Sequence, residues 1–432
     1  MFNYIFTLRL AVLFLLLIVL VFTIGDVLVV NILGISLVCF ILVLAGVVEN
    51  NDWKSPLVYF PIVFMLYHIV FPIYFYLGGD RTYGVSLDSV ISATTQVIIF
   101  LSGMVFSYLL SPIGGRKGTV DLLRHKVYYF GITEIKIIFF LFIALYLYSY
   151  VQLLSALGMS KEQRMISGVI SFSVFFGGVY FCYLYIMNSL IVKTGFFNKS
   201  LFLFVITLGF FGFIFFGERD QLVLPIVASF FLYSYYKPVS FKRVLLFGCS
   251  IFFLLFLLGI VRESLEGTQL REISSLVSVL EQNEFISTGR NLALVNDSNI
   301  QHLYGLTYLG DLGYSFFIKA NDTGLQWFES NYVTNKGFSI VAEAYVNFGL
   351  VGVFSLGFLI MSLMLYFYRK SFGNNISMII YIILVVAFLY CIRSDFGAVF
   401  SAAVKKIGIP LSLLVIARLY NGKVYIYSRR KV

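Results

Sequence analysis

Three polar side chains lie at helical spacing at the start of an apolar segment. Ser339, Glu343 and Asn347 are four residues apart, so they share one face of a helix that begins near Gly337. A carboxylate at this place can accept the proton of an attacking hydroxyl group, and such a polar face in a membrane helix needs water or a ligand as its partner. The alternative is ordinary interfacial polarity, because a glutamate near a helix N-terminus is favoured by the helix dipole. Glu343 is therefore the first candidate for a catalytic base.

Charged residues also cluster where other apolar segments end. Glu218 and Arg219 join two segments that are short for crossing a bilayer, and Arg393 and Asp395 precede the last predicted span. Charges there are costly and usually face the protein interior, a partner or a substrate, although an arginine–carboxylate pair that only caps a turn gives the same pattern. Glu218 and Asp395 are further catalytic candidates, ranked behind Glu343.

Several basic and polar side chains at the ends of these segments are candidates for binding an anion or a sugar. Arginine suits bidentate contacts with phosphate oxygens because its guanidinium group is a planar fork of donors. The candidates for diphosphate or sugar binding are Arg219, Arg262, Arg290, Lys336, Tyr345, Asn347 and Arg393.

The composition excludes a water-soluble protein. Of the 432 residues, 60% are hydrophobic and 12% are charged, whereas a soluble domain carries about 25% charged residues. Apolar segments long enough to cross a bilayer as helices follow one another along the chain. The predicted fold is an all-α polytopic membrane protein with about twelve transmembrane helices. The predicted spans are 5–24, 27–48, 56–77, 89–111, 132–157, 166–191, 200–216, 221–236, 244–261, 338–368, 376–391 and a last one that ends near 418.

The placement of lysine and arginine predicts the orientation. With the N-terminus in the cytoplasm, sixteen basic residues fall in inside loops and at most seven in the short outside loops, as the positive-inside rule requires. Both termini are then cytoplasmic. The net charge of +10, which in a soluble protein would suggest nucleic acid, reports this bias and contact with anionic lipid. The predicted organisation is transmembrane helices 1–9 over 1–261, a large outward loop, partly helical, over 262–337, transmembrane helices 10–12 over 338–418 and a basic cytoplasmic tail over 419–432.

The last predicted span contains Lys405 and Lys406, which would lie in mid-membrane in one straight helix. A short re-entrant segment over 396–404, before the final helix, would keep both lysines near water.

The long loop is acidic, so an anion site there must come from a few arginines rather than from bulk charge. Residues 262–286 carry apolar side chains near helical spacing, which predicts an amphipathic helix lying on the membrane. Aromatic residues of the loop could stack on sugar rings, but packing within the loop's own small core is the favoured interpretation. They are Tyr304, Tyr308, Tyr314, Trp327, Phe328 and Tyr332.

The sequence shows no motif for a metal, a disulfide or a nucleotide. His68, His125 and His302 are not at the spacing of metal ligands, and of the three only His302 is placed for acid–base chemistry on the outer face. The four cysteines lie in apolar segments, as buried free cysteines do. We therefore expect no metal, no cofactor and no cytoplasmic nucleotide substrate.

With these features the chain resembles the Wzy-type O-antigen polymerases of bacteria, which join oligosaccharide repeat units. The likeness lies in the many spans, the one large outward loop late in the chain, and Glu218-Arg219 at an outer hairpin. It also lies in the segment Gly337–Gly352, with Glu343, Tyr345 and Asn347, and in Arg393 before the last span. The topology likeness covers the whole chain, and the specific part of the motif likeness is Gly337–Gly352.

The resemblance implies a glycosyl transfer on the periplasmic face of the inner membrane, without metal or nucleotide, in the synthesis of lipopolysaccharide or a similar surface polysaccharide. The growing chain on undecaprenyl diphosphate would pass to a new lipid-linked repeat unit. The implied partners are the undecaprenyl-diphosphate-linked oligosaccharide, membrane lipids, a chain-length regulator and a flippase, with no nucleic acid. The basic candidates would contact diphosphate or sugar, and Glu343, Glu218 or Asp395 would serve as base.

Two other functions, a transporter and a scaffold, stay open at this point, and the sequence argues against a third. The related O-antigen ligases carry a histidine eleven residues before the glycine that matches Gly349, where this chain has Phe338, which argues against a ligase. A transporter or flippase for lipid-linked oligosaccharides usually places paired charges at mid-membrane and keeps its loops short. A scaffold in an assembly complex would not need a charged outer cluster.

Overall fold

The computed structural model describes residues 2–23, 27–50, 52–79, 84–112, 130–154, 170–216, 219–265, 284–297, 300–318, 322–332 and 337–420. Two predicted site residues, Glu218 and Lys336, lie outside these ranges. So does 266–283, which forms most of the predicted amphipathic membrane-surface helix.

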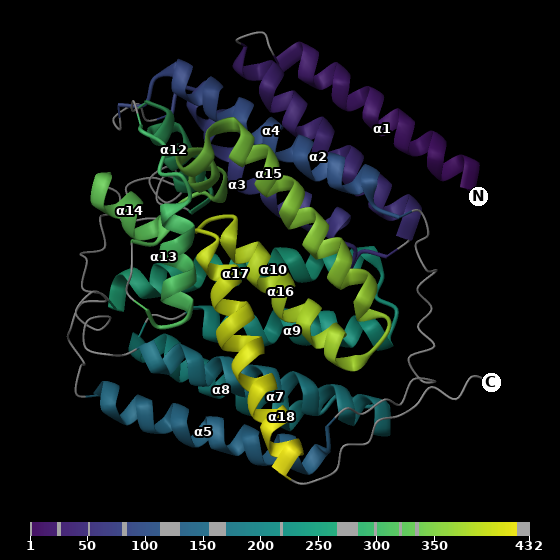
Figure 1. The fold of residues 1–432 in the computed structure, drawn as a ribbon, viewed down its shortest axis with the longest axis vertical. Helices are drawn as coiled ribbons and strands as arrows, with labels where there is room; N and C mark the ends of the chain where they lie inside the picture. The colour runs from purple at the N-terminus through teal and green to yellow at the C-terminus, as the bar shows by residue number, and fades with distance from the viewer. Residues whose placement is uncertain are drawn as a thin grey trace. The chain divides into compact units, whose positions relative to one another are not determined.

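The described chain is built of helices, and no strand occurs in it, so the all-α prediction is confirmed. In chain order the helices are α1 (Phe2–Thr23), α2 (Leu28–Asn50), α3 (Pro56–Tyr76), α4 (Leu87–Leu110), α5 (Ile132–Leu154), α7 (Ile170–Thr194), α8 (Lys199–Phe216), α9 (Arg219–Tyr236), α10 (Phe241–Leu265), α12 (Glu284–Asp297), α13 (Leu306–Ser315), α14 (Gly324–Asn331), α15 (Ile340–Ser371), α16 (Asn375–Cys391), α17 (Gly397–Ser401), the π-helix η2 (Ala402–Gly408) and α18 (Ile409–Tyr420) (Figure 1).

Each predicted span coincides with helix, and seven segments of the described chain are long and apolar enough to cross a membrane. They are α2, α3, α4, α5, α7, α15 and the segment Gly397–Leu419, and α1, α8, α9 and α16 are shorter apolar helices. The protein is thus a polytopic membrane protein. The number of twelve spans and the orientation stay predictions.

The chain folds as two compact units. Unit 1 comprises Met1–Val120, Ser240–Phe372 and Leu384–Ser401, and unit 2 comprises Asp121–Val239, Gly373–Ile383 and Ala402–Val432. The candidate site residues whose side chains are described all belong to unit 1.

In unit 1, helices α4 and α15 pack with their backbones in contact. A Cβ atom on Gly103 would lie 2.1 Å from the carbonyl oxygen of Phe354, and one on Gly357 would lie 2.1 Å from the carbonyl oxygen of Phe100. Small residues allow such close approach between membrane helices. The hydroxyl groups of Ser107 and Ser362, 2.8 Å apart, add an interhelical hydrogen bond. This contact fixes α15, which carries Glu343, on α4.

Helix α12 belongs to the predicted outward loop, yet it is almost wholly buried within unit 1. It packs against α3 and α4. The ring of Phe285 stacks on that of Tyr67 at 4.3 Å, and the Nδ2 of Asn296 donates to the Oε1 of Gln96 at 3.2 Å. Ser287, Thr288 and Asn291 have no exposed surface. This part of the predicted loop is therefore core of the unit rather than a free surface segment.

In unit 2, the hairpin of α8 and α9 is held by a tyrosine and a glycine contact. The hydroxyl of Tyr146 donates to the carbonyl oxygen of Leu208 and to the Oε1 of Gln221, both at 3.0 Å. A Cβ atom on Gly209 would lie 2.2 Å from the carbonyl oxygen of Gln221, so the two helices touch. Helix α9 begins at Arg219, whose side chain is not described.

The end of the chain does not contain the predicted re-entrant segment over 396–404. Helical residues follow one another from Gly397 to Tyr420, with a π-helical stretch around Lys405 and Lys406. Lys405 is buried, and Lys406 lies against Gly177 of α7, 2.9 Å from a Cβ built there. Protein atoms rather than water surround Lys405, which is why the chain need not turn back there.

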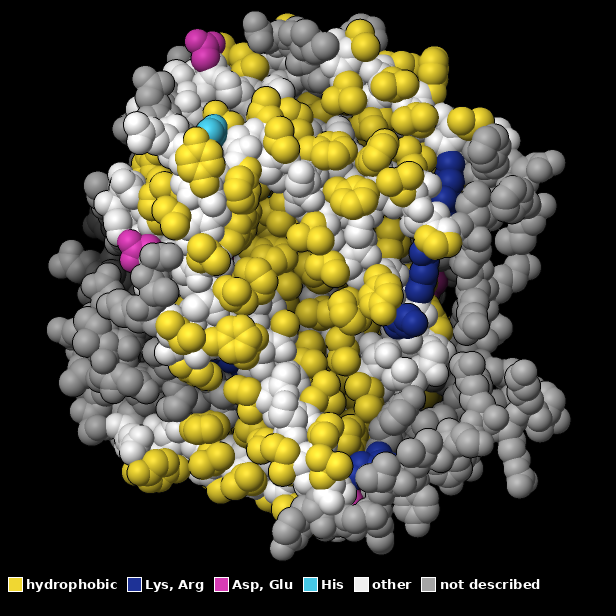
Figure 2. Space-filling model, in the orientation of Figure 1, with side chains coloured by type: hydrophobic (Ala, Val, Ile, Leu, Met, Phe, Trp, Pro, Cys, Tyr) yellow, Lys and Arg dark blue, Asp and Glu magenta, His cyan; other side chains and the backbone are white. Residues whose placement is uncertain are grey.

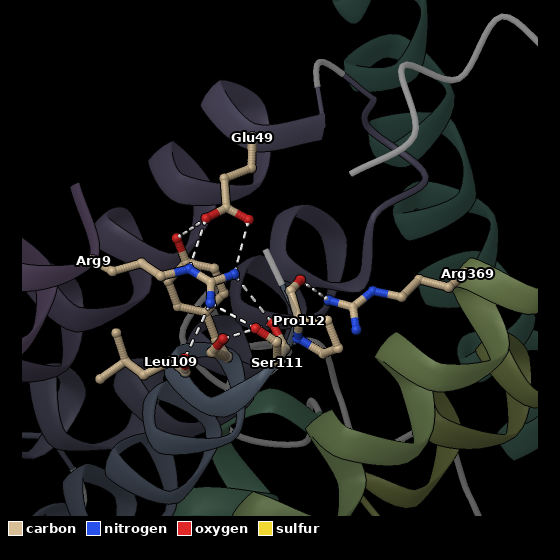
Figure 3. A network of polar contacts seen from close by, with 7 residues as sticks. Arg9, Glu49, Leu109, Ser111, Pro112 and Arg369 are labelled. Carbon is tan, nitrogen blue, oxygen red and sulfur yellow. Dashed lines mark hydrogen bonds and ion pairs between the residues drawn. The ribbon is translucent and has the colours of Figure 1, made fainter. Parts of the chain in front are cut away.

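A buried arginine ties three helices of unit 1 together (Figure 3). The Nε of Arg9 in α1 donates to the Oε1 of Glu49 in α2 at 3.0 Å, and its Nη1 donates to the carbonyl oxygens of Leu109 and Ser111 at 3.1 and 2.6 Å. The hydroxyl of Tyr108 donates to the same glutamate at 2.6 Å. Arg9 therefore forms an ion pair with the buried Glu49 and donates to the carbonyl groups that have no helical partner at the C-terminal end of α4.

Replacing Arg9 with methionine should lower the free energy of unfolding by about 3–5 kcal/mol, because it leaves Glu49 buried without its cation. The measurement is unfolding of the purified protein in detergent. The double variant R9M/E49M should recover part of the loss, because it removes both charges.

Arg369 supplies the matched control. It lies beside the same network, is half-exposed and donates to the carbonyl oxygen of Pro112 at 3.2 Å (Figure 3). R369M should change stability by less than about 1 kcal/mol. Equal losses for R9M and R369M would contradict the role given to Arg9.

Candidate functional site

Helix α15 is broken two turns after it begins. Phe348 (φ −139°, ψ 16°) and Gly349 (φ 61°, ψ −152°) are not helical, so Ile340–Asn347 forms a short helix ahead of the long one. In practice only glycine adopts the backbone conformation of Gly349. A break of this kind exposes backbone carbonyl groups, which need partners inside a membrane protein.

Those partners come from the turn before α13. The N–H of Leu303 donates to the carbonyl oxygen of Val346, and the N–H of Tyr304 donates to that of Asn347, both at 3.0 Å. The N–H of Gly305 donates to the Oδ1 of Asn347 at 3.0 Å. The loop backbone therefore completes the end of the short helix.

The predicted polar face of Ser339, Glu343 and Asn347 exists, and all three side chains have no exposed surface. Ser339 caps α15 by accepting from the N–H of Val341, and its Oγ lies 3.1 Å from the Nε2 of His68 in α3. The expectation that water or a ligand satisfies this face does not hold in this conformation, because groups of the same unit do so.

Glu343 lies at the centre of these contacts. The hydroxyl of Thr307 in α13 donates to its Oε1 at 3.1 Å, and the N–H of Phe396 donates to its Oε2 at 2.7 Å. Asn347 supports the arrangement by donating to the Oγ1 of Thr307 at 2.7 Å. Both carboxyl oxygens of Glu343 therefore have donors from other segments.

Two aspartates complete the group. The first two N–H groups of α14 donate to them: that of Gly324 to the Oδ1 of Asp311 at 3.2 Å, and that of Leu325 to the Oδ2 of Asp395 at 3.0 Å. Open N–H groups at a helix N-terminus favour negative partners. Helix α14 is thus fixed by the two carboxyl groups.

Two glycines show how close the three carboxyl groups are. A Cβ atom on Gly324 would lie 2.7 Å from the Oε1 of Glu343 and 3.0 Å from the Cβ of Asp395. One on Gly397 would lie 2.9 Å from the Oδ1 of Asp311 and 3.1 Å from the Oδ1 of Asp395. We call Asp311, Glu343 and Asp395 the carboxyl cluster.

The three side chains of the carboxyl cluster are buried together. Among the described residues, no basic side chain forms an ion pair with any of its three members. Burial, and then the nearby Asp395, raise the pKa of Asp311 from its ordinary 3.8 to about 7, and burial likewise raises the pKa of Asp395. Like charges so close together favour a shared proton over full ionisation.

Two of the predicted basic residues, Arg290 and Arg393, lie near the start of α15. The backbone carbonyl of Arg393 accepts from the N–H of Phe338 at 3.0 Å, and its guanidinium lies over the ring of Tyr390 at 4.6 Å. Arg290 is buried in α12, and its neighbour Asn291 donates to the carbonyl oxygen of Gly337. Arg290 and Arg393 therefore come from elements that meet at Gly337. Arg262 lies near the end of α10, and its side chain is not described.

Tyr345 and His302 lie at the break in α15. The two rings meet edge to face at 5.8 Å, and the Nε2 of His302 lies 3.2 Å from a Cβ built on Gly349. His302 is exposed and Tyr345 is half-exposed. The histidine singled out for the outer face is thus an open titratable group beside the short helix.

Three of the six aromatic residues named for the loop, Trp327, Phe328 and Tyr332, pack with one another, whereas Tyr308 packs on Phe348 and Phe396. Phe328 has no exposed surface, and its ring stacks on those of Tyr332 and Phe338 at 4.9 and 4.8 Å. Tyr304 differs, with 82% of its surface exposed.

Sequence reasoning missed Asp311 and Thr307 as site residues. The signal available was their spacing: Thr307, Asp311 and Ser315 are four apart and share one face of α13. That face meets Glu343 only through long-range packing, which the spacing does not reveal.

The arrangement can hold and exchange a proton among three carboxyl groups and can fix α13 and α14 on α15. Because Glu343 and Asp395 are buried, neither carboxylate is open to a substrate in this conformation. The described residues contain no group of side chains suited to hold a metal ion.

Lowering the pH should tighten the docking of α13 and α14. An acid whose pKa is raised in the folded state contributes stability that is complete below its ordinary pKa of 3.8 and is lost as the pH rises to about 7. The protection factors of the α13 and α14 amides, which are their exchange rates corrected for the intrinsic chemical rate, should therefore be larger at a pH of about 5 than at about 8.

Asp311→Asn should weaken that pH dependence, whereas Asp322→Asn, at an exposed position just before α14, should leave it unchanged. Exchange that follows only the intrinsic chemical rate across this range would argue against the raised pKa.

Comparison with known proteins bears on the same part of the chain. Residues 334–424 match the model of a family described as O-antigen polysaccharide polymerase Wzy, and this segment contains Glu343, Arg393 and Asp395. Comparisons with curated proteins and with solved structures gave no match. The resemblance inferred from the sequence is confirmed over this part of the chain: residues 334–424 are similar to the family of Wzy-type O-antigen polysaccharide polymerases.

Proposed function

We propose that this protein polymerises undecaprenyl-diphosphate-linked oligosaccharide repeat units into O-antigen or a similar surface polysaccharide, at the periplasmic face of the bacterial inner membrane. The observation that carries the proposal is the family match over 334–424, which supports O-antigen polymerisation at the level of the family. The multi-pass helical fold fits a lipid-linked substrate.

The proposed reaction is a glycosyl transfer. The bond between the anomeric carbon of the growing chain and its diphosphate breaks, and a bond forms between that carbon and a hydroxyl oxygen at the non-reducing end of the new unit. The hydroxyl proton passes to a base, and undecaprenyl diphosphate leaves. The energy comes from the lipid diphosphate, so the reaction as proposed uses no metal and no nucleotide.

The protein must supply a base and cations for the leaving group. We propose Glu343 as the base, with Asp395 and Glu218 as the other candidates. The proposed diphosphate and sugar contacts are Arg219, Arg262, Arg290, Lys336, Tyr345, Asn347 and Arg393. Because Glu343 and Asp395 are buried in the conformation described, the proposal requires that α13 and α14 move away from α15 when substrate binds.

Glu343→Gln tests the base. The amide has the shape of the carboxyl group but cannot accept the proton, so polymer should fall by about 10²–10⁴-fold while the protein stays folded. The readouts are polymer length and amount in a strain that lacks the native gene, and the ladder made from lipid-linked units by purified protein in liposomes.

Asp322→Asn, which alters an exposed acid of the same segment, is the control and should behave as the unchanged protein. Polymer of normal length and amount from E343Q would remove Glu343 as the base. Loss of folding in E343Q would instead assign it to the docking of α13.

Gly324→Ala tests the carboxyl cluster without altering a charge. The added methyl group would lie 2.7 Å from the Oε1 of Glu343, so it should displace α14 and lower polymer yield. Gly248→Ala in α10 is the matched control, because a Cβ there meets nothing within 4 Å. Equal yields from both variants would show that the close packing at Gly324 does not matter for function.

A flippase for lipid-linked oligosaccharides is the second candidate, and one observation favours it. Broken helices such as α15 occur in transporters, where the break often marks the substrate site. The liposome assay separates the two: laddered product supports the polymerase, and substrate that crosses without elongation supports the flippase.

A further inference from the structure

Helix α13 presents its apolar side outward and its polar side inward. Thr307, Asp311 and Ser315 are buried on the face that meets α15 and α17. On the opposite face, Leu309 is 56% exposed and Phe316 is 54% exposed. A helix on the surface of a water-soluble domain shows the reverse arrangement.

The apolar face extends past the C-terminal end of the helix. Leu306 and Leu312 continue it within α13, and Phe317 and Ile318 follow the last turn, all of them exposed. Between Leu303 and Ile318 the one charged side chain is Asp311, which is buried. A segment that meets water would carry charges on this side.

This face is continuous with the exposed surface of a candidate membrane span. The ring of Tyr308 stacks on Phe348 of α15 at 6.2 Å, and Phe348, Leu350 and Val351 are exposed. Val351 lies two residues after Gly349 in the candidate span Ile340–Ser371, and 76% of its surface is exposed. Hydrophobic side chains gather over the place of α13 and next to α15 in the space-filling view (Figure 2).

We propose that α13 is embedded in the hydrocarbon region of the bilayer, with lipid acyl chains covering Leu306, Leu309, Leu312, Phe316, Phe317 and Ile318. The continuity with α15 argues for bilayer lipid as the occupant, because the side chains next to Phe348 belong to a segment that crosses the membrane. The polar face of α13 then needs the carboxyl cluster and Asn347 as partners, since no water reaches it.

Helix α13, which covers the carboxyl cluster, then lies at the level of the lipid acyl chains. A group that reaches Glu343 past α13 would approach from the membrane rather than from bulk water. The location of α13 is independent of which reaction the protein performs.

The test is fluorescence of one tryptophan on the outward face. Trp53 and Trp327 are replaced by phenylalanine, and Leu309→Trp is introduced into this background. The protein is reconstituted into phosphatidylcholine vesicles whose acyl chains carry bromine, which quenches tryptophan only within the hydrocarbon. Val351→Trp on α15 is the positive control, and Asp322→Trp, at an exposed polar position before α14, is the negative control.

We expect L309W to be quenched by brominated chains to within a factor of about two of V351W, and D322W to be quenched far less. Strong quenching of L309W by acrylamide from water, with none by bromine, would overturn the proposal. Shielding from both quenchers would also overturn it and would point to a protein contact such as a second copy of the chain. No substrate is present, so the result stands apart from the polymerase assay, and a single symmetrical peak in size-exclusion chromatography confirms that each variant is folded.

Discussion

The hydrogen bonds of Glu343 hold together the segments that make up the candidate site. Its two carboxyl oxygens accept from Thr307 of α13 and from the N–H of Phe396 at the start of α17. The adjoining Asp311 and Asp395 accept the first amides of α14. Without these buried acceptors, the donors of α13, α14 and α17 would lose their partners in a place where water does not replace them. The position of the loop helices on α15 therefore depends on three carboxyl groups, with Glu343 at their centre.

Glu49 and Glu343 are two glutamates of unit 1 whose buried carboxylates are stabilised differently. Glu49 is compensated by the guanidinium of Arg9, which also satisfies carbonyl groups of α4. Glu343 has neutral donors and two neighbouring carboxyl groups instead. An ion pair is stable over a wide pH range, whereas a cluster of carboxyl groups depends on where its protons lie. The first arrangement suits a permanent link between helices, and the second suits a link that can open.

The break in α15 joins this cluster to the rest of the unit. The short helix Ile340–Asn347 ends where Gly349 adopts a conformation that other residues avoid, and the backbone of Leu303 and Tyr304 closes it. The exposed His302 and the half-exposed Tyr345 lie at the same break. Buried carboxyl groups, an open histidine and an interrupted helix thus occupy one small region, inside the segment that matches the polymerase family or next to it.

The sequence by itself determined the membrane class, the helical segments and the shared face of Ser339, Glu343 and Asn347, because hydropathy and the 3.6-residue period are local properties of the chain. It also indicated the likeness to the polymerase family, through the segment around Glu343. Only the tertiary structure decided that this face is sealed by Thr307 and Phe396, that Asp311 joins Glu343 and Asp395, and that α12 of the expected loop is core. These contacts join residues that are tens of positions apart in the sequence. The periodicity of the sequence is local, so it does not show which distant group donates a hydrogen bond to a buried carboxylate. The orientation of α13 was decided in the same way: Thr307, Asp311 and Ser315 share one helical face by their spacing, but the burial of this face follows from where Glu343 lies.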